Sequence, residues 1–348
     1  LTAVIAALLL TVSQIFAHWI LIFLNTPDNI IGMSLLYLRI VFCGIPVVAA
    51  YNVFAAVLRA LGNSRTPLIA MVIAASINVV LDILFVAEFH WGVAGAAIAT
   101  VIAQAFSALY CFLAVRKIEI VKVTKEDFRR VAGLDGRLLK LGTPVLFQDV
   151  IISVGGLVVQ YVVNGYGFLF VAGFTATNKL YGILEMAAIS YGYAIVTYVG
   201  QNLGAGEIRR IKKGVHAGAG LAFLTSAVIS CIMFVFGKHI LMLFISGDPA
   251  ETHEVLAIAW KYLSIMATCL CILYFLYVYR SALQGLGNTL IPMLSGIVEF
   301  FVRIGVALLL PLVMGTDGIF YAEIAAWTGA AVLLAASYYI SVKKLETL

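Results

Sequence analysis

The sequence LRALGNSRTP occupies residues 58–67 and recurs as LQGLGNTLIP at residues 283–292, with five of the ten residues identical. Each copy lies between two long apolar segments. The register holds further out, since the Tyr-Leu pair at 37–38 recurs at 262–263 and Gly92 recurs as Gly318. Internal repeats of this kind build the two halves of many transporters around a site near the bilayer midplane. The repeat therefore predicts a duplicated helical membrane protein.

Composition points independently to the same class. Hydrophobic residues make up 63% of the chain and charged residues 11%, and the mean hydropathy is +1.08, all far outside the range of soluble domains. The stretches long enough to cross about 30 Å of hydrocarbon lie at residues 1–24, 30–58, 67–87, 92–115, 141–164, 168–200, 214–245, 255–284, 290–314 and 318–342. We therefore predict an all-α polytopic membrane protein with ten transmembrane helices.

The two halves are unequal in length. The second runs over residues 141–342 and the first only over 1–115, a shortfall of roughly 85 residues, or about two membrane helices with their loops. Leu1 falls opposite about Leu221, well inside the second half. We therefore expect an N-terminally truncated chain: a partial N-terminal lobe of four helices (1–115), a cytoplasmic linker (116–140), a C-terminal lobe of six helices (141–342) and a cytoplasmic tail (343–348).

Basic residues indicate the orientation, because Lys and Arg concentrate in loops that stay in the cytoplasm. Seventeen of the 22 fall in alternate connections, Arg280 being counted among them, and eight of these lie in the linker. This pattern predicts a multi-pass protein of the cell membrane with both ends of the chain cytoplasmic. It also accounts for the net charge of +5 without a nucleic-acid partner. Within the linker, residues from Thr124 onward could form an amphipathic helix on the inner leaflet or a solvated charged segment.

The sequence lacks the usual motifs for disulfides, metal binding, phosphate binding and catalysis. The five cysteines lie in apolar spans without a CxxC pair, and the five histidines show no HExxH spacing. No Gly-rich phosphate loop or nucleophile elbow occurs, and no acidic or His cluster of an intramembrane enzyme stands at a helix end. We expect no cofactor, no metal site beyond that of a coupling cation, and no enzymatic activity.

Ionisable residues inside the spans are costly in hydrocarbon and usually face a cavity or a partner. Asp82 follows Asn78 by four residues, so both side chains project from one helix face. The next span offers a surface of small residues that ends in Thr100. Asn78, Asp82 and Thr100 could together supply oxygens to a proton or a sodium ion. The alternative is a carboxylate held by buried hydrogen bonds for packing alone.

Four segments together resemble the multidrug and toxic compound extrusion (MATE) family of cation-coupled exporters. They are LRALGNSRTP at 58–67, INVVLD at 77–82, WGVAGAAIAT at 91–100 and VGQNLGAG at 199–206. The resemblance covers essentially the whole chain. It implies twelve helices in two six-helix lobes, of which the ten predicted here would be the third to the twelfth.

The resemblance also implies a cation site in the N-terminal lobe, formed by an Asn and an Asp on the fifth helix, a Thr on the sixth and an Asp on the first. The first three map onto Asn78, Asp82 and Thr100, and the fourth would lie outside this chain. Other members place carboxylates on the seventh and tenth helices. Here the seventh-helix candidates are Gln148 and Asp149 and the tenth helix has none in its interior, so a sodium site in the C-terminal lobe is not expected.

Further polar and aromatic residues of the spans could line a substrate cavity. Glu185 would suit a cationic substrate, and tyrosines could add cation–π contacts, although lipid-facing or packing roles are the alternative. Glu299 and Arg303 stand four apart, which predicts that they neutralise one another. The cavity candidates are Glu185, Gln148, Asp149, Lys179, Tyr191 and Tyr274.

The resemblance and the residues together predict a secondary antiporter. It would export amphipathic, mainly cationic drugs or toxic organic compounds in exchange for H+ or Na+, by alternating access between two lobes. The expected partners are the lipid bilayer and small organic cations, and we expect a monomer. The alternative is a flippase or exporter of lipid-linked saccharides from the same superfamily, which a strongly basic cavity would favour.

Overall fold

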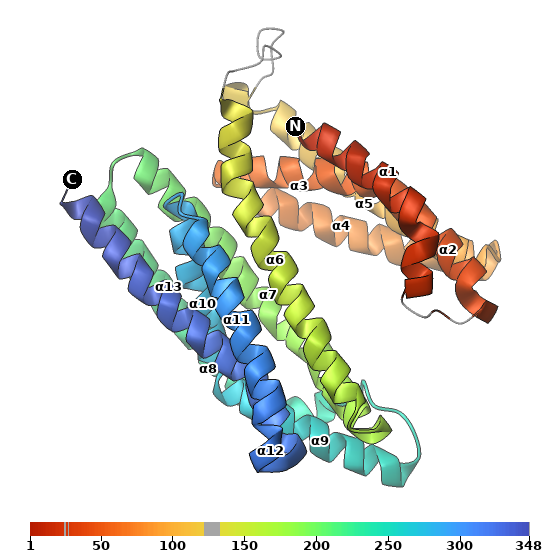
Figure 1. Cartoon of the computed structure of the whole chain (residues 1–348). Coiled ribbons are helices and arrows are strands. Elements are labelled where there is room, and N and C mark those ends of the chain that lie inside the picture. The colour runs from red at the N-terminus through yellow and green to blue at the C-terminus, as the bar shows by residue number, and fades with distance from the viewer. Residues whose placement is uncertain (24–25, 27, 122–132, 348) are drawn as a thin grey trace. The chain divides into compact units, whose positions relative to one another are not determined.

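In the computed structural model, residues 1–23, 26, 28–121 and 133–347 are described, and every regular element among them is helical. The first half contains α1 (Thr2–Phe23), α2 (Asp28–Cys43), α3 (Ile45–Ala60), α4 (Arg65–Asp82), the π-helix η1 (Ile83–Glu88), α5 (Gly92–Arg116) and the short 3₁₀ helix η2 (Glu119–Val121). The second contains α6 (Leu134–Asn164), α7 (Phe168–Gly204), α8 (Ile208–Met242), α9 (Pro249–Thr268), α10 (Leu270–Gly285), α11 (Leu290–Leu309), α12 (Pro311–Met314), the 3₁₀ segment η4 (Gly315–Tyr321) and α13 (Ala322–Glu346) (Figure 1). The predicted all-α class is confirmed.

The chain divides into two compact units, Leu1–Asp135 and Gly136–Leu348. Helix α5 ends at Arg116 and α6 begins at Leu134. The amphipathic helix predicted from Thr124 falls on residues 122–132, which lie outside the described residues. At the other end α13 continues to Glu346, so the predicted tail is mostly the last turn of this helix.

Several helices meet the requirements for crossing a bilayer. In the described part of the chain, eight helical stretches are long and apolar enough, or nine if the bent pair α9 and α10 forms one span. One stretch, Leu290–Glu346, is 57 residues long and contains both α11 and α13, which run side by side (Figure 1). Since about 20 residues are enough for one crossing, this stretch accounts for two of the predicted spans.

The repeated motif is a signal that stops one helix and starts the next. Gly62 and Gly287 adopt φ of 83° and 79°, a left-handed conformation that glycine tolerates best. The following residues, Asn63 and Asn288, accept hydrogen bonds from the main-chain N–H three residues later, at 3.1 and 3.2 Å. Each asparagine, one residue before the N-cap positions Ser64 and Thr289, thereby satisfies a main-chain N–H in the first turn of α4 or α11. The duplicated turn positions α3 with α4 and α10 with α11 in the same way.

Two of the predicted spans are broken in the middle. Helix α2 gives way to α3 at Gly44, and α9 gives way to α10 at Cys269 with a bend of 50°. These two positions are 225 residues apart, the same offset that separates the repeated motifs. The break therefore belongs to the duplicated unit. Residues 29–60 are still one candidate span, and α9 and α10 form another if the bent pair is taken together, as predicted at 30–58 and 255–284.

A side chain from the preceding helix supports each break. Gln14 of α1 donates to the main-chain oxygen of Arg39 at 2.8 Å, and Ser230 of α8 donates to that of Ala267 at 2.6 Å. Because hydrocarbon offers no hydrogen bonds, main-chain oxygens beside an irregular turn need such donors. These contacts stabilise a bend within an apolar segment, because they supply hydrogen bonds that lipid cannot provide.

Candidate functional site

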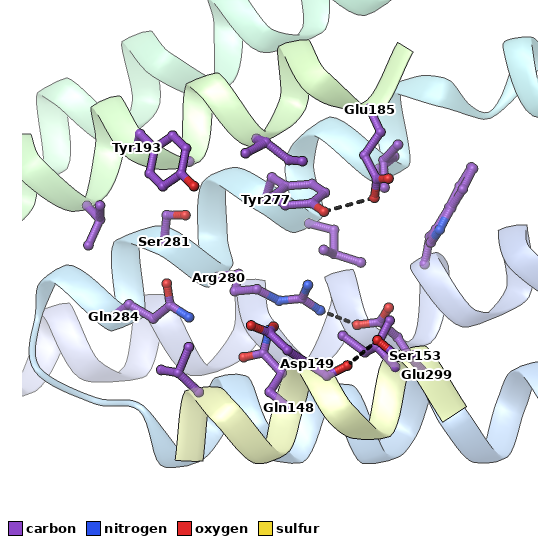
Figure 2. A pocket seen from close by; sticks show the side chains of 18 of the residues that line it. Gln148, Asp149, Ser153, Glu185, Tyr193, Tyr277, Arg280, Ser281, Gln284 and Glu299 are labelled. Atoms are coloured by element: carbon purple, nitrogen blue, oxygen red, sulfur yellow. Dashed lines mark hydrogen bonds and ion pairs between the residues drawn. The ribbon is translucent and has the colours of Figure 1, made fainter. Parts of the chain in front are cut away.

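A cavity of about 610 Å³ lies inside the C-terminal lobe, between α6, α7, α10, α11 and α13 (Figure 2). We call it the central cavity. Its polar walls come from side chains that lie far apart in the sequence. The charged or hydrogen-bonding residues that line it are Gln148, Asp149, Ser153, Tyr181, Glu185, Tyr193, Tyr277, Arg280, Ser281, Gln284, Glu299, Arg303, Glu323 and Trp327.

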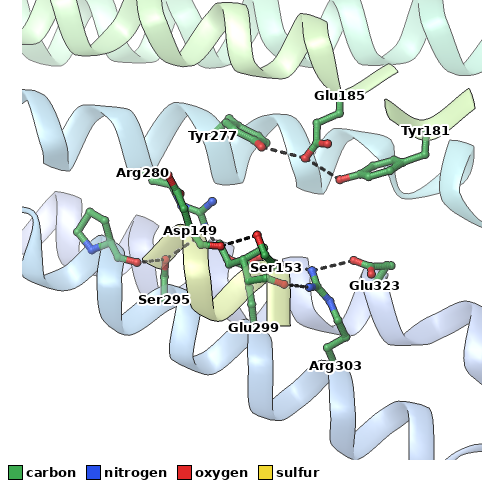
Figure 3. Close-up of polar contacts among 12 residues, drawn as sticks. Asp149, Ser153, Tyr181, Glu185, Tyr277, Arg280, Ser295, Glu299, Arg303 and Glu323 are labelled. Atoms are coloured by element: carbon green, nitrogen blue, oxygen red, sulfur yellow. Dashed lines mark hydrogen bonds and ion pairs between the residues drawn. The ribbon is translucent and has the colours of Figure 1, made fainter. Parts of the chain in front are cut away.

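One wall holds a chain of alternating charges that ties three helices together (Figure 3). Arg280 of α10 forms an ion pair with Glu299 of α11. Arg303, one turn further along α11, lies 3.9 Å from Glu299 and 2.9 Å from Glu323 of α13. The side chains of Arg280, Glu299 and Arg303 are at most 7% exposed and that of Glu323 is 16% exposed. Charges so far from water are tolerable only because each has a partner.

The chain of charges is also anchored to neutral groups. Arg303 donates to the main-chain oxygen of Ile152 on α6 at 3.1 Å, and Arg280 donates to Ser295 at 3.3 Å. Glycine lets α6 come close here, since a Cβ on Gly155 would lie 3.4 Å from the Arg303 guanidinium and 3.3 Å from a Phe300 ring carbon. The predicted pairing of Glu299 with Arg303 within α11 is thus the longest contact of a larger network.

Glu185 lies on the opposite wall and is held differently. Tyr181 and Tyr277 both donate to its Oε1 oxygen, at 2.8 and 2.9 Å (Figure 3). No ion pair to Glu185 is found among the described residues. Two hydroxyl groups fix one oxygen of the carboxylate, which leaves Oε2 as the oxygen for a ligand in the cavity. The stacked rings of Tyr181 and Trp327, with centroids 5.6 Å apart, form the adjoining wall.

Asp149 and Gln148 complete the site on α6, across from Arg280 (Figure 2). Gln148 is 3% exposed, and its Oε1 atom has no hydrogen-bond partner in the described part of the chain. A Cβ on Gly296 would lie 3.0 Å from Gln148, which shows how closely α6 and α11 pack there. With Asp149 and Glu185 added to the ion chain, the lining contains four carboxylates and two guanidinium groups.

The structure brings Glu185, Gln148 and Asp149 together in this cavity, but not the other three predicted substrate contacts. Lys179 is exposed on α7 and does not line the cavity. Tyr191 donates or accepts a hydrogen bond with Thr225 on α8 at 2.7 Å. Tyr274 is fully buried and donates to the main-chain oxygen of Leu184 at 3.1 Å. The helical phase of the two tyrosines points them to neighbouring helices.

Sequence reasoning missed Arg280, which it assigned to a cytoplasmic connection. The residue is 6% exposed and belongs to the wall of the cavity. The signal was present, because Arg280 precedes the motif at 283–292 by three residues and therefore lies inside α10 rather than in the turn. Tyr181 and Tyr277 were also missed as partners of Glu185, and 92 residues separate Tyr277 from it.

The predicted cation site in the N-terminal lobe lies on two packed helices. Asn78 and Asp82 share α4, and the π-helix η1 begins directly after Asp82. The Asn78 Nδ2 and Asp82 Oδ1 atoms are shielded from solvent and have no hydrogen-bond partner among the described residues. Thr100 on α5 donates to the main-chain oxygen of Ala96 at 2.9 Å. Short π-helical turns occur frequently at functional sites. Buried polar atoms without a protein partner are usually satisfied by a water, an ion or a ligand.

A smaller pocket of about 290 Å³ lies in the same lobe. Its lining residues include Val48, Asn52 and Ala74. Adding the repeat offset of 225 to these numbers gives Leu273, Tyr277 and Glu299, which all line the central cavity. The two lobes therefore contain hollows at equivalent places, with different side chains around them. Within the described residues, no cluster of three or more His, Cys, Asp or Glu side chains could hold a metal ion.

Comparisons with known proteins give consistent matches. The sequence profile of the MatE family matches residues 1–84 and 144–309. The chain is 33% identical over 237 residues to the probable multidrug resistance protein YpnP of Bacillus subtilis (strain 168), covering 68% of this chain and 53% of that protein. It is 29% identical over 273 residues to the probable multidrug resistance protein YoeA of the same strain, covering 75% and 59%. This chain thus spans little more than half the length of these curated relatives.

A solved structure gives the same fold. A MOP superfamily transporter from Pyrococcus furiosus superposes on 99% of this chain and 77% of its own, with a TM-score of 0.91 at 17% sequence identity. At this identity the likeness concerns the fold alone.

Proposed function

The chain belongs to the MatE family, and from this premise we propose that it exports amphipathic, mainly cationic organic compounds in exchange for H+ or Na+. The curated relatives named above are described as probable multidrug resistance proteins. Export of this kind would proceed by alternating access, in which two lobes open in turn to the two sides of the membrane.

The observation that carries the proposal is the charge of the central cavity. Glu299 and Glu323 are matched by Arg280 and Arg303, so Glu185 and Asp149 remain as two carboxylates in excess. Glu185 is half-buried and Asp149 is exposed, and an organic cation entering the cavity would balance both negative charges where the protein supplies no cation for them. The rings of Tyr181, Tyr277 and Trp327 add apolar surface for the organic part of such a ligand.

Coupling would take place at Asp82 in the N-terminal lobe. Its unpaired Oδ1 could take up a proton or coordinate a hydrated sodium ion, and the unpaired Nδ2 group of Asn78 could donate a hydrogen bond to a water bound there. Occupation of this carboxylate would neutralise a buried charge and favour a different packing of α4 and η1 on α5. If the central cavity binds the organic cation less tightly in one packing than in the other, the entry of the ion promotes release of the substrate.

The runner-up is a flippase of lipid-linked saccharides, whose anionic substrate would need a basic cavity. The Pyrococcus furiosus transporter is described as having a binding pocket of reverse polarity that suggests a different function. In the present chain the carboxylates outnumber the guanidinium groups, which favours cations. We further propose a location in the cell membrane with both ends of this chain cytoplasmic, action as a monomer, and no cofactor.

A drug-susceptibility panel tests the proposal. The gene in its natural full length would be expressed in cells lacking their own exporters, and organic cations would be compared with neutral and anionic compounds of similar size. We expect resistance to cations alone, and its dependence on added sodium would identify the coupling ion. Resistance confined to anionic compounds, or none to any cation, would overturn it.

A further inference from the structure

A second pocket, of about 570 Å³, lies in the C-terminal lobe and is lined by residues of the α6–α7 turn, α9 and η4. We call it the end pocket. Four aromatic side chains from two separate segments line it: Tyr166, Phe168, Phe170 and Phe320. Phe168 is 76% exposed, whereas Phe170 and Phe320 are 7% and 1% exposed. The pocket therefore presents one largely exposed ring, Phe168, beside rings that the described chain mostly covers.

The charged residues of the end pocket favour a cation. Lys261 of α9 forms an ion pair of 2.5 Å with Asp317 of η4, and Glu254 lies about two turns before Lys261 on the same face of α9. Both members of the ion pair are about half exposed, so the pair lies at the rim. One carboxylate remains in excess when Lys261 and Asp317 neutralise each other. Aromatic faces combined with a carboxylate are the usual means of binding organic ammonium ions.

A stack of rings separates the end pocket from the central cavity. Phe170 stacks on Phe320 with centroids 5.4 Å apart, Phe320 on Tyr262 at 5.1 Å, and Tyr262 on Phe174 at 4.8 Å. The last three are at most 2% exposed. We call Phe174, Tyr262 and Phe320 the ring layer.

The order of residues along the chain places the ring layer between the two hollows. Along α7, Phe170 lines the end pocket, Phe174 belongs to the layer and Tyr181 lines the central cavity. From η4 into α13, Asp317 lines the end pocket and Glu323 the central cavity, with Phe320 between them. The two hollows therefore follow one another along the same helices.

The ring layer is fixed by close helix packing. A Cβ on Gly173 would lie 2.9 Å from the side chain of Ile258, so α7 and α9 are in direct contact there. One turn later, Thr177 donates to the main-chain oxygen of Ala259 at 2.9 Å. An organic cation cannot pass this layer without a movement of α7 relative to α9. A ligand in the end pocket is thus held apart from one in the central cavity.

We propose that the end pocket is a second binding site for organic cations, distinct from the central cavity. The inference rests on the proposed function, because it assigns the same class of ligand to a further place in the same lobe. The rings of Phe168 and Phe170 and the Glu254 carboxylate hold the cation, and the closed ring layer keeps the two sites separate.

Equilibrium binding of radiolabelled tetraphenylphosphonium to the purified full-length protein tests this. We expect two molecules bound per chain. Phe168→Ala and Glu254→Gln should each lower the affinity of the same site, the end pocket, by about threefold to fivefold. This is the size of one exposed cation–π or ionic contact. Glu185→Gln should weaken the other site only. Because Phe168 and Glu254 are exposed, neither change disturbs the core.

Matched controls come from the same region. Glu251→Gln removes an exposed carboxylate from the first turn of α9 that does not line the end pocket, and Phe244→Ala removes a partly exposed ring nearby. Neither should change either site, and the neutral triphenylphosphine oxide should not occupy the end pocket. A single site sensitive to Glu185→Gln alone would overturn this inference and leave the proposed function standing. Equal binding of the neutral compound, or a second site indifferent to Phe168→Ala and Glu254→Gln, would also overturn it. No binding at all would count against both.

Discussion

The two lobes share a scaffold and differ in charge at equivalent positions. With the repeat offset of 225, Asn78 of α4 corresponds to Arg303 of α11, and Ala74 corresponds to Glu299. The C-terminal lobe uses these positions for a buried network of ion pairs around a cavity of about 610 Å³. The N-terminal lobe has a neutral amide and a methyl group there, and its unpaired carboxylate, Asp82, lies one turn beyond.

This difference shows how a duplicated fold can divide two tasks. The helix-stop motif and the break at Gly44 or Cys269 are features of the scaffold and occur in both halves. The ionisable side chains are not duplicated. A single buried carboxylate oxygen without a partner, such as Asp82 Oδ1, suits a small ion, whereas several fixed charges around a large cavity suit an organic ligand.

The strongest test of this comparison exchanges the equivalent residues. Arg303→Asn places the side chain of the N-terminal lobe into the C-terminal network, leaves Glu323 without its ion-pair partner and leaves Glu299 with Arg280 alone. We expect the free energy of unfolding to fall by about 3–5 kcal/mol, as for other broken buried ion pairs. Denaturation of the purified protein in detergent measures it. A loss below about 1 kcal/mol would mean that the network is solvated like a surface pair.

The next largest effect concerns ligand affinity at Glu185. Glu185→Gln keeps the shape and removes the charge, so we expect the affinity of the central cavity for tetraphenylphosphonium to fall about tenfold to a hundredfold. Lys179→Gln, on the same helix but outside the cavity, is the matched control and should have no effect. Unchanged affinity in the Glu185 variant would move the cation site to Asp149.

The tyrosines that hold Glu185 should contribute less. Tyr277→Phe removes one of two hydrogen bonds to the Oε1 atom, and loss of one such bond is worth about 1 kcal/mol, or roughly fivefold in affinity. Tyr274→Phe is the control, because its hydroxyl bonds to the main-chain oxygen of Leu184 away from the cavity. If both variants bind equally well, the tyrosines have a packing role only.

The smallest effect is expected at an exposed ion pair. Lys212 and Glu346 are 2.9 Å apart at the cytoplasmic end predicted for the C-terminal lobe, with side chains 48% and 42% exposed. Lys212→Gln should lower the free energy of unfolding by less than about 1 kcal/mol. A loss as large as that of Arg303→Asn would show that an exposed ion pair contributes as much to the free energy of unfolding as a buried one.

Much of the fold could be predicted from the sequence because its signals are local or periodic. Apolar length predicts the spans, and the repeat predicts the two halves. The turn after residue 61 is readable because glycine and asparagine have specific roles in stopping and capping helices. The break at Cys269 was not predictable in this way, since no glycine or proline marks it. Its equivalence to Gly44 becomes visible only once the register of the repeat is applied.

The site could be predicted only in part because its contacts join distant residues. A carboxylate inside a span indicates a partner or a cavity, and on this basis the sequence predicts that Glu185 and Asp149 line a cavity. The sequence does not say which partner is chosen, as with Arg280 and Glu299, which lie 19 residues apart on different helices. The sequence also does not show that Tyr277 faces the cavity and Tyr274 does not, because the orientation of both side chains depends on the bend between α9 and α10.

The central claim is that coupling belongs to Asp82 and substrate binding to Glu185. The most direct measurement follows tetraphenylphosphonium in proteoliposomes containing the full-length protein, with and without an imposed pH or sodium gradient. We predict that Asp82→Asn still binds the cation and exchanges it between the two sides, but no longer responds to either gradient. Glu185→Gln should lose exchange and gradient-driven efflux together. Efflux by Asp82→Asn with the wild-type rate and the wild-type response to a gradient would contradict this division of tasks.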